Sequence, residues 1–223
     1  MAHTLPAPAP LPGAHLDLAK MPGHWVLARM GKRVLRPGGL ALTVRMLDAL
    51  GIDGLDHVVE LAPGLGLTAR LALARQPKRY TAIERDAAAA ENVRRVLRDP
   101  RDRCVQGSAE ATGLADGVAT VVYGEAMLSM QTPAQKAAIV REAFRVLAPG
   151  GRYALHEMSM VPDCVPDPVK EQAMRDLSAA IHVGARPLTP GEWRALLEAA
   201  GFRVERVMLA PMHLLEPARV VQD

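Results

Sequence analysis

The segment spanning residues 57–70 places the tightest constraint on how this 223-residue chain can fold. An apolar run that includes Val58 and Val59 ends in the acid Glu60, and a Pro63-Gly64-Leu65-Gly66 turn then leads into a helix start. This order predicts a buried strand, a glycine loop and a helix N-terminus. Such a junction points backbone N–H groups and the positive end of the helix dipole at whatever lies over the loop. We therefore expect the loop to bind a ligand.

A second acid, Glu84, follows Gly64 by twenty residues and ends another apolar run, Tyr80 to Ile83. Two acids on adjacent strand ends, one on each side of a glycine loop, predict a nucleoside pocket. The spacing alone does not say which nucleoside the pocket takes.

Beyond this junction, apolar runs alternate with amphipathic segments. Strands are expected at 57–62, 79–84, 103–107, 119–124, 152–158 and 202–209, and helices at 40–50, 66–75, 86–97, 133–147, 168–182 and 190–200. This alternation predicts an α/β fold, a doubly wound and mostly parallel sheet with helices on both faces. Ligands of such sheets bind outside the carboxyl ends of the strands. We expect one rim there to carry Glu60, Glu84, Ser108, Glu125 and Glu157.

The two ends of the chain differ from this core. Residues 1–14 are rich in Ala and Pro without the pattern of a signal peptide, so we expect a disordered tail. Residues 15–223 should form one domain, with a helical cap at 15–51 and a core at 52–223. The cap should include a helix at 22–34, with cations at 29–36.

After residue 209 only fourteen residues remain, so the last strand is expected to be short or missing, with extended pieces at most at 212–215 and 218–221. An open sheet edge would favour a homodimer.

Composition narrows the classes of partner. The net charge of +3 and pI of about 9.1 are only mildly basic, and no basic stripe interleaves with aromatics, so we expect no nucleic-acid partner. Cys104 and Cys164 lack metal or redox spacing, which predicts a reducing, cytoplasmic setting and no metal site. No apolar run approaches the roughly 20 residues that span a bilayer. The 11 Met residues against 3% aromatics predict an adaptable core or pocket.

The glycine pattern Gly64-x-Gly66-x-x-Ala69 also fits the dinucleotide fingerprint, so an NAD-dependent oxidoreductase is one alternative. Glu60, four residues before Gly64, instead suits a cofactor that carries an ammonium group. Three further strings resemble the class I methyltransferases that depend on S-adenosylmethionine (SAM). They are Arg-Glu-Ala-Phe-Arg-Val-Leu-Ala-Pro-Gly-Gly-Arg-Tyr-Ala at 141–154, Gly-Ser-Ala-Glu-Ala-Thr-Gly-Leu at 107–114 and Leu-Leu-Glu-Ala-Ala-Gly-Phe-Arg-Val at 196–204. The resemblance covers about residues 40–210, with the motifs in the family's order.

This resemblance implies a Rossmann-like methyltransferase fold, SAM as the cofactor and S-adenosylhomocysteine as its product. It implies that Glu60 holds the cofactor's amino group and that Glu84 accepts both ribose hydroxyls. The loop from Gly64 to Gly66 would approach the methionyl and ribose portion. Ala62, followed by Pro63, stands where the family usually has the first loop glycine.

For the adenine ring, the resemblance implies contacts with Arg85 and Ile83 on its faces and with the backbone of Ala109 at its edge. Ser108 stands where an Asp commonly contacts the adenine amino group, so selectivity would rest on Glu110 or on backbone groups.

The acceptor of the methyl group should enter over the end of the fourth strand, where Glu125 is the candidate general base, acceptor anchor and further cofactor contact. His156 and His182 are the other catalytic candidates. Strand alternation should send His156 and Glu157 to opposite faces. Met127, Met130, Met158 and Met160 predict an apolar or polarisable small-molecule acceptor. The alternatives are a lipid or macromolecular acceptor, and a protein that binds SAM without turnover.

Overall fold

The computed structural model describes Met21 and residues 38–211. In this part of the chain five strands form one parallel sheet in the order β3-β2-β1-β4-β5. The strands are β1 (His57–Leu61), β2 (Arg79–Glu84), β3 (Arg103–Gln106), β4 (Ala119–Glu125) and β5 (Leu147–His156). The helices are α2 (Gly39–Leu50), α3 (Leu67–Leu73), α4 (Ala87–Arg94), α5 (Pro133–Val146), α6 (Asp167–Ile181) and α7 (Pro190–Ala199), with a short 3₁₀ turn η2 (Leu128–Met130). The predicted doubly wound α/β fold is confirmed.

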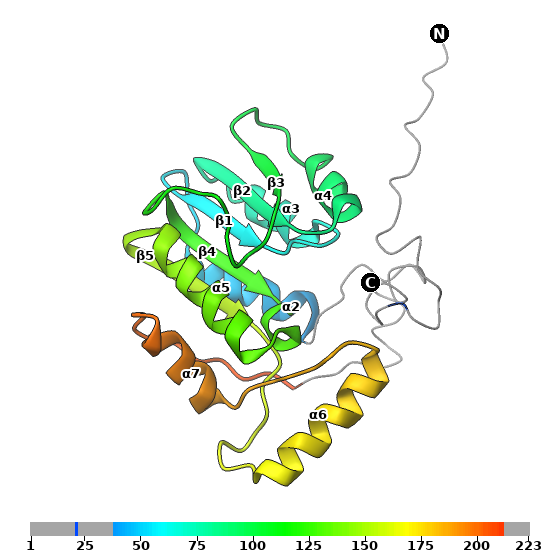
Figure 1. Cartoon of the computed structure of the whole chain (residues 1–223). Helices are drawn as coiled ribbons and strands as arrows, with labels where there is room; N and C mark the ends of the chain where they lie inside the picture. The colour runs from blue at the N-terminus through cyan, green and yellow to red at the C-terminus, as the bar shows by residue number, and fades with distance from the viewer. Residues whose placement is uncertain (1–20, 22–37, 212–223) are drawn as a thin grey trace.

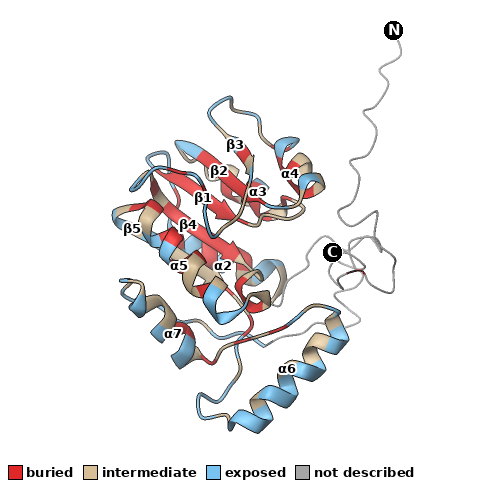
Figure 2. Cartoon of the chain, in the orientation of Figure 1, coloured by how far each residue is buried: buried red, intermediate tan, exposed pale blue. Residues whose placement is uncertain are grey.

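The sheet separates two hydrophobic clusters, and helices cover both of its faces (Figures 1 and 2). On one face α2, α3 and α4 pack on alternate strand residues such as Val58, Tyr80 and Tyr123. On the other face α5 and α7 pack on the intervening residues, such as Val59 and Val122. All five residues of β1 are buried, as expected for the central strand of a sheet covered on both faces.

The strand register brings the carboxyl ends of β1, β2 and β4 to one level. Leu61 lies opposite Ile83 on β2 and opposite Gly124 on β4. Glu125 in turn lies opposite His156 at the end of β5. The chain leaves all four strands along this edge, which we call the carboxyl rim.

Local sequence explains where the helices begin. Thr132 and Gln135 form a capping box at the start of α5, and Thr189 and Glu192 form one at the start of α7. Each of these helices has proline at its first position. The Asp86 carboxylate accepts the Ala89 N–H and caps α4. These caps place helix starts along the carboxyl rim.

Two strands of the carboxyl rim end in an alanine with left-handed backbone. Ala62 follows β1 with φ 53°, and Ala126 follows β4 with φ 50°. Each N–H donates to the neighbouring strand, Ala62 to the Ile83 carbonyl at 2.8 Å and Ala126 to the His156 carbonyl at 2.8 Å. A left-handed turn at position 62 agrees with the loop glycine that the methyltransferase resemblance implies there, because a Cβ costs energy in this conformation.

The strand expected at 202–209 is wrong, since residues 202–211 form neither helix nor strand. The Phe202 N–H donates to the Leu197 carbonyl, and its ring packs on Phe144 and Tyr153. Within the described residues β5 is therefore an outer strand of the sheet, because 202–209 does not pair with it. The β5 strand also begins earlier than expected, at Leu147, because an irregularity absorbs the Pro-Gly-Gly segment between the paired residues Leu147 and Arg152.

The chain between β5 and α7 forms an arm that carries α6. No residue of α6 is buried (Figure 2). The two stems of the arm meet at a bridge between Ser159 and Leu188. The stem that leads back from α6 to α7 is held at Arg186. The Arg186 N–H donates to the Ser129 carbonyl at 2.6 Å, and the Arg186 carbonyl accepts a hydrogen bond from the Lys136 Nζ at 2.5 Å. The arm is therefore fixed at its base while α6 projects.

Several sequence expectations lie outside the described residues. They are the tail at 1–14, the helix at 22–34 with its cations at 29–36, most of the cap at 15–51 and the extended pieces at 212–215 and 218–221. Within Met21 and residues 38–211, no helix is long and apolar enough to cross a membrane.

Replacing Ala62 or Ala126 by glycine should raise the free energy of unfolding by about 0.5 kcal/mol, because relief of the left-handed strain slightly exceeds the added entropy of the unfolded chain. Urea unfolding of each variant measures the change. The matched control is Ala173→Gly in the exposed middle of α6, which should lower the free energy by about 1 kcal/mol. Losses at positions 62 and 126 equal to the control's would contradict the strain.

Candidate functional site

The glycine loop after β1 is fastened to the end of β2 by Glu84. Its Oε2 accepts the Gly64 N–H at 3.0 Å, and its Oε1 accepts the Asp86 N–H at 2.9 Å. Burial raises the pKa of the Glu84 carboxyl above its usual range, and these backbone donors oppose the shift. A carboxylate oxygen can accept more than one hydrogen bond, so Glu84 keeps acceptor capacity for a ligand's hydroxyls.

Space lies above the glycine loop. Gly64 has φ 57°, and a Cβ built there would meet nothing within 4 Å. The Pro63 carbonyl accepts the Gly66 N–H at 3.1 Å, which closes the turn before α3. Gly66 caps α3 with φ 75°, where a Cβ would lie in ordinary van der Waals contact with Val93 and Val96. The loop thus leaves room on its outer side for the close approach of a ligand.

A pocket opens beside this loop at the carboxyl rim. Its wall is made of Ala62, Ile83, Glu84, Arg85, Gly107, Ser108, Ala109, Glu110, Met127, Gln131 and Ile139. Seven of these residues are predicted cofactor contacts, namely Ala62, Ile83, Glu84, Arg85, Ser108, Ala109 and Glu110. Residues from the ends of β1, β2, β3 and β4 therefore meet in one pocket, as the sequence predicts.

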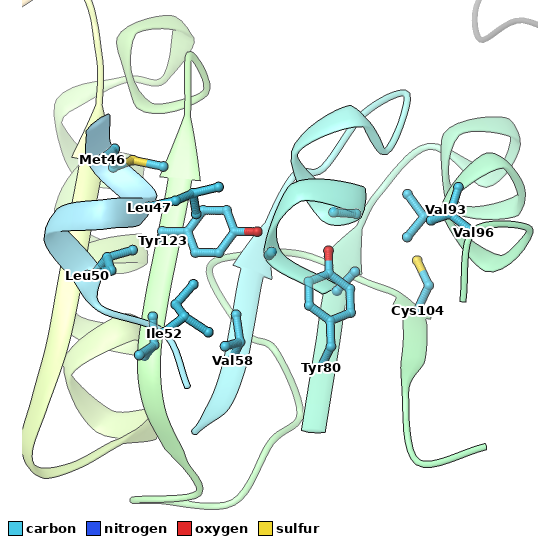
Figure 3. Close-up of a cluster of buried hydrophobic side chains, with 14 of the residues drawn as sticks. Met46, Leu47, Leu50, Ile52, Val58, Tyr80, Val93, Val96, Cys104 and Tyr123 are labelled. Atoms are coloured by element: carbon cyan, nitrogen blue, oxygen red, sulfur yellow. The ribbon is translucent and has the colours of Figure 1, made fainter. Parts of the chain in front are cut away.

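Glu60 points into the core beneath the loop. Its Oε2 accepts the hydroxyls of Tyr80 at 2.5 Å and Tyr123 at 2.6 Å. Figure 3 shows the two tyrosine rings on either side of β1. Burial, followed by the Glu60 charge, raises the pKa of both tyrosines well above the usual range, so both hydroxyls stay protonated donors. Glu60 thereby cross-links β1, β2 and β4, and its contact with a cofactor's amino group stays a prediction.

Glu125 stands at the centre of a second network, on the same face of the sheet as Glu60. Its Oε1 accepts the Thr43 hydroxyl at 2.7 Å and lies 2.7 Å from the Nδ1 of His156. Its Oε2 accepts the Thr68 hydroxyl at 2.6 Å. One carboxylate therefore joins α2, α3, β4 and β5, and its set of donors favours a positioning role over proton abstraction.

Glu157 turns to the opposite face from His156, as strand alternation predicts. Its carboxylate accepts the N–H groups of Met127, Leu128 and Ser129 at 2.9, 2.8 and 2.9 Å, and the Ser129 hydroxyl at 2.7 Å. Burial raises the pKa of the Glu157 carboxyl. These bonds fix the segment after β4 that carries the pocket residue Met127.

The third catalytic candidate, His182, lies apart from this network. It is exposed at the end of α6, where it caps the helix with φ 55°. The structure therefore joins Glu125 to His156 and leaves His182 on the arm. Across Met21 and residues 38–211, no group of three or more His, Cys, Asp or Glu side chains is arranged to hold a metal ion.

Sequence reasoning missed the partners that hold these acids. Thr43 is 82 positions from Glu125 along the chain, and Tyr123 is 63 positions from Glu60. No local pattern identifies them. Side chains alternate between the two faces of a strand, so the positions of Tyr80 and Tyr123 on the strands beside β1 could have indicated that both tyrosines share a face with Glu60.

Residues 59–155 match the family described as "Methyltransferase domain". A relative from Haemophilus influenzae, which carries the name "Uncharacterized protein", is 29% identical over 206 residues, covering 90% of this chain and 80% of that protein.

Two solved structures show the same fold. A candidate methyltransferase from Bacillus halodurans C-125 has a TM-score of 0.66 at 24% identity, over 74% of this chain and 71% of that one. Geranyl diphosphate C-methyltransferase from Streptomyces coelicolor A3(2), in complex with Mg²⁺, geranyl diphosphate and S-adenosylhomocysteine, has a TM-score of 0.62 at 20% identity. That match covers 72% of this chain and 59% of the other.

Replacing Thr43 or Thr68 by the isosteric valine should lower the free energy of unfolding by about 1–2 kcal/mol, because each change removes a donor from the buried Glu125 carboxylate. Urea denaturation of each variant gives the value.

A double-mutant cycle with Glu125→Gln supplies the control, since the neutral amide tolerates the missing donor better. In that background each valine should cost clearly less. Equal costs in both backgrounds would mean that the threonines act by packing and not through Glu125.

Proposed function

We propose that this chain, whose residues 59–155 match the family described as "Methyltransferase domain", transfers a methyl group from SAM to a small organic acceptor. The observation that carries this proposal is the Glu84 carboxylate. It is bonded to the Gly64 N–H and also faces the pocket whose wall includes Ser108, Ala109 and Glu110.

The residues present fit the cofactor. Glu84 would accept the two ribose hydroxyls while keeping its bonds to the loop, a bidentate task suited to a carboxylate. The space above Gly64 admits the methionyl and ribose portion without a side-chain collision. Ile83 and Arg85 would flank the adenine ring, whose edge would face Ser108, Ala109 and Glu110.

Glu60 is the candidate partner for the amino group of the cofactor. Glu60 lies under the loop with its carboxylate bonded to two tyrosine hydroxyls. We propose that Glu60 acts on the ammonium group through its negative charge and through the loop that it supports. A bridging water would serve the same purpose.

SAM supplies an electrophilic methyl group on a sulfonium, so the protein mainly has to align the acceptor with it and exclude water. For an acceptor that loses a proton, we propose His156 as the receiving group, with Glu125 orienting its ring through Nδ1. This arrangement supports a positioning role for Glu125. Because His182 lies on the arm, it would contact the acceptor only from that side.

An apolar or polarisable acceptor is supported by the methionines after β4 and β5. Met127 lines the pocket, and Met158 is buried beside Ser129, to whose hydroxyl its N–H donates at 3.2 Å. Thioethers adapt to irregular apolar surfaces. The geranyl diphosphate that the Streptomyces enzyme binds is a small molecule of partly apolar character, which agrees with this class.

We further propose a homodimer and a cytoplasmic setting. In the described residues the outer edge of β5 has no strand partner, and an open edge favours pairing with a second chain. Cys104 and Cys164 are both free thiols, which agrees with a reducing compartment.

Glu84→Ala should weaken binding of S-adenosylhomocysteine about 100-fold, because it removes two charge-assisted hydrogen bonds to the ribose and releases the Gly64 loop. Isothermal titration calorimetry measures the affinity. In the wild type the affinity should also fall as pH drops through the Glu84 pKa, which burial raises, because a protonated carboxyl accepts fewer hydrogen bonds. The variant should lack this pH dependence.

Asp102→Asn is the matched control. Asp102 is another partly buried acid that accepts a backbone N–H, that of Tyr80 at 2.8 Å, but it lies at the opposite end of the strands. This variant should bind like the wild type. A wild type that does not bind S-adenosylhomocysteine would overturn the proposed function. Normal binding by Glu84→Ala would overturn only the assigned role of Glu84.

A further inference from the structure

The segment from Gly107 to Thr112, which we call the adenine loop, is suspended between two anchors. At its start the Gly107 N–H donates to the backbone carbonyl of Glu84 at 2.9 Å. At its end Thr112 donates both its N–H, at 2.7 Å, and its hydroxyl, at 2.6 Å, to Oε1 of Glu142. The first anchor is made by backbone alone, whereas the second depends on one side chain of α5.

The Glu142 carboxylate is itself held in one orientation. Arg145, one turn further along α5, donates to Oε2 at 2.8 Å and to Oε1 at 2.7 Å. Arg145 also pairs with Asp116, which follows the loop in sequence. The Arg145 guanidinium, together with the Thr112 donors, lowers the pKa of Glu142 to about 2. The carboxylate is therefore ionised and fixed at any working pH.

The residues between the two anchors form one wall of the pocket. Ser108, Ala109 and Glu110 all line it. Within the loop the Ala111 N–H donates to the Ser108 carbonyl, and the Glu110 N–H donates to the Ser108 hydroxyl at 3.2 Å. These turns set the direction of the backbone groups. The two anchors, together with the packing of Ala109 on the hydrophobic cluster that contains Ile83, set the position of the loop.

We propose that Glu142 is a positioning residue for recognition of the adenine ring, acting through Thr112 on the placement of Ser108 to Glu110. This inference rests on the proposed function, because it assigns the ring to this wall. Hydrogen bonds to a ring edge discriminate only when donor and acceptor are held in register. Glu142 supplies that register from outside the pocket, without touching the ring.

A purely structural role for Glu142 would weaken all ligands alike, so the test compares two ligands. S-adenosylhomocysteine presents an amino group at the base edge. The analogue in which hypoxanthine replaces adenine presents a carbonyl there and an N–H at the adjacent ring nitrogen, with the ribose and homocysteine portions unchanged. The ratio of the two affinities measures how strongly the pocket wall made by Ser108, Ala109 and Glu110 discriminates between the two bases.

Isothermal titration calorimetry of both ligands is done with the wild type, Glu142→Gln and Thr112→Val. One or two register-dependent hydrogen bonds should give the wild type about a tenfold preference for adenine. In Glu142→Gln the preference should fall to about twofold, because the neutral amide loses its tie to Arg145 and holds Thr112 weakly. Thr112→Val keeps the Glu142–Arg145 pair and removes one donor, so it should give an intermediate ratio. Thr112→Val decides the question if Glu142→Gln does not fold.

Asp56→Asn is the matched control. Asp56 is buried like Glu142 and accepts the same three kinds of donor, namely a backbone N–H from Asp53, the hydroxyl of Thr120 and the guanidinium of Arg152. It lies just before β1, at the amino end of the sheet. This variant should lose stability but keep the wild-type preference for adenine.

Three results would overturn the inference. The first is an unchanged preference in Glu142→Gln and Thr112→Val while S-adenosylhomocysteine still binds. The second is an equal loss of preference in Asp56→Asn, and the third is a wild type that binds both ligands equally. A wild type that binds neither ligand would instead overturn the proposed function, and this inference with it.

Discussion

The site depends on hydrogen bonds from backbone N–H groups to buried carboxylates. At the carboxyl rim Glu84 holds the glycine loop and Glu157 holds the segment after β4, and Glu142 of α5 holds Thr112. Loops at strand ends lack sheet partners for their N–H groups, and an unsatisfied buried donor is costly. A carboxylate satisfies two or three such donors at once with bonds stronger than those of neutral acceptors. The same bonds that stabilise the loops therefore also fix the walls of the pocket.

Two further glutamates act between elements instead of within loops. Glu60 draws two tyrosine hydroxyls together across β1, and Glu125 connects two threonines and a histidine from four elements. Both lie on the face covered by α2 and α3. A buried charge that loses one partner destabilises strongly, so each network tolerates little movement of the elements it joins. The rim is rigid because its acids are satisfied from several directions.

Structure could be predicted from the sequence where it depends on residues close together along the chain. The strand expected at 57–62 is observed as His57–Leu61, and the acid twenty residues after Gly64 does bond to the glycine loop. The strand prediction failed at residues 202–209, which have strand-forming side chains but do not pair with β5, the outer strand of the described sheet. The sequence also could not assign Glu125, whose partners Thr43 and Thr68 come close only after α2 and α3 have packed. A carboxylate at a strand end has the same sequence signature whether it meets a ligand or a threonine.

The arm between β5 and α7 has a consequence for how such a protein can diversify. Its base is held by Ser129, Lys136 and Leu188, whereas α6 contributes no buried residue to the core. Changes of sequence or length beyond that base would leave the sheet and the glycine loop nearly undisturbed, since little folding energy is stored there. The arm is thus the place where a lineage could acquire new specificity at small risk to its fold, while the nucleoside pocket stays under constant constraint.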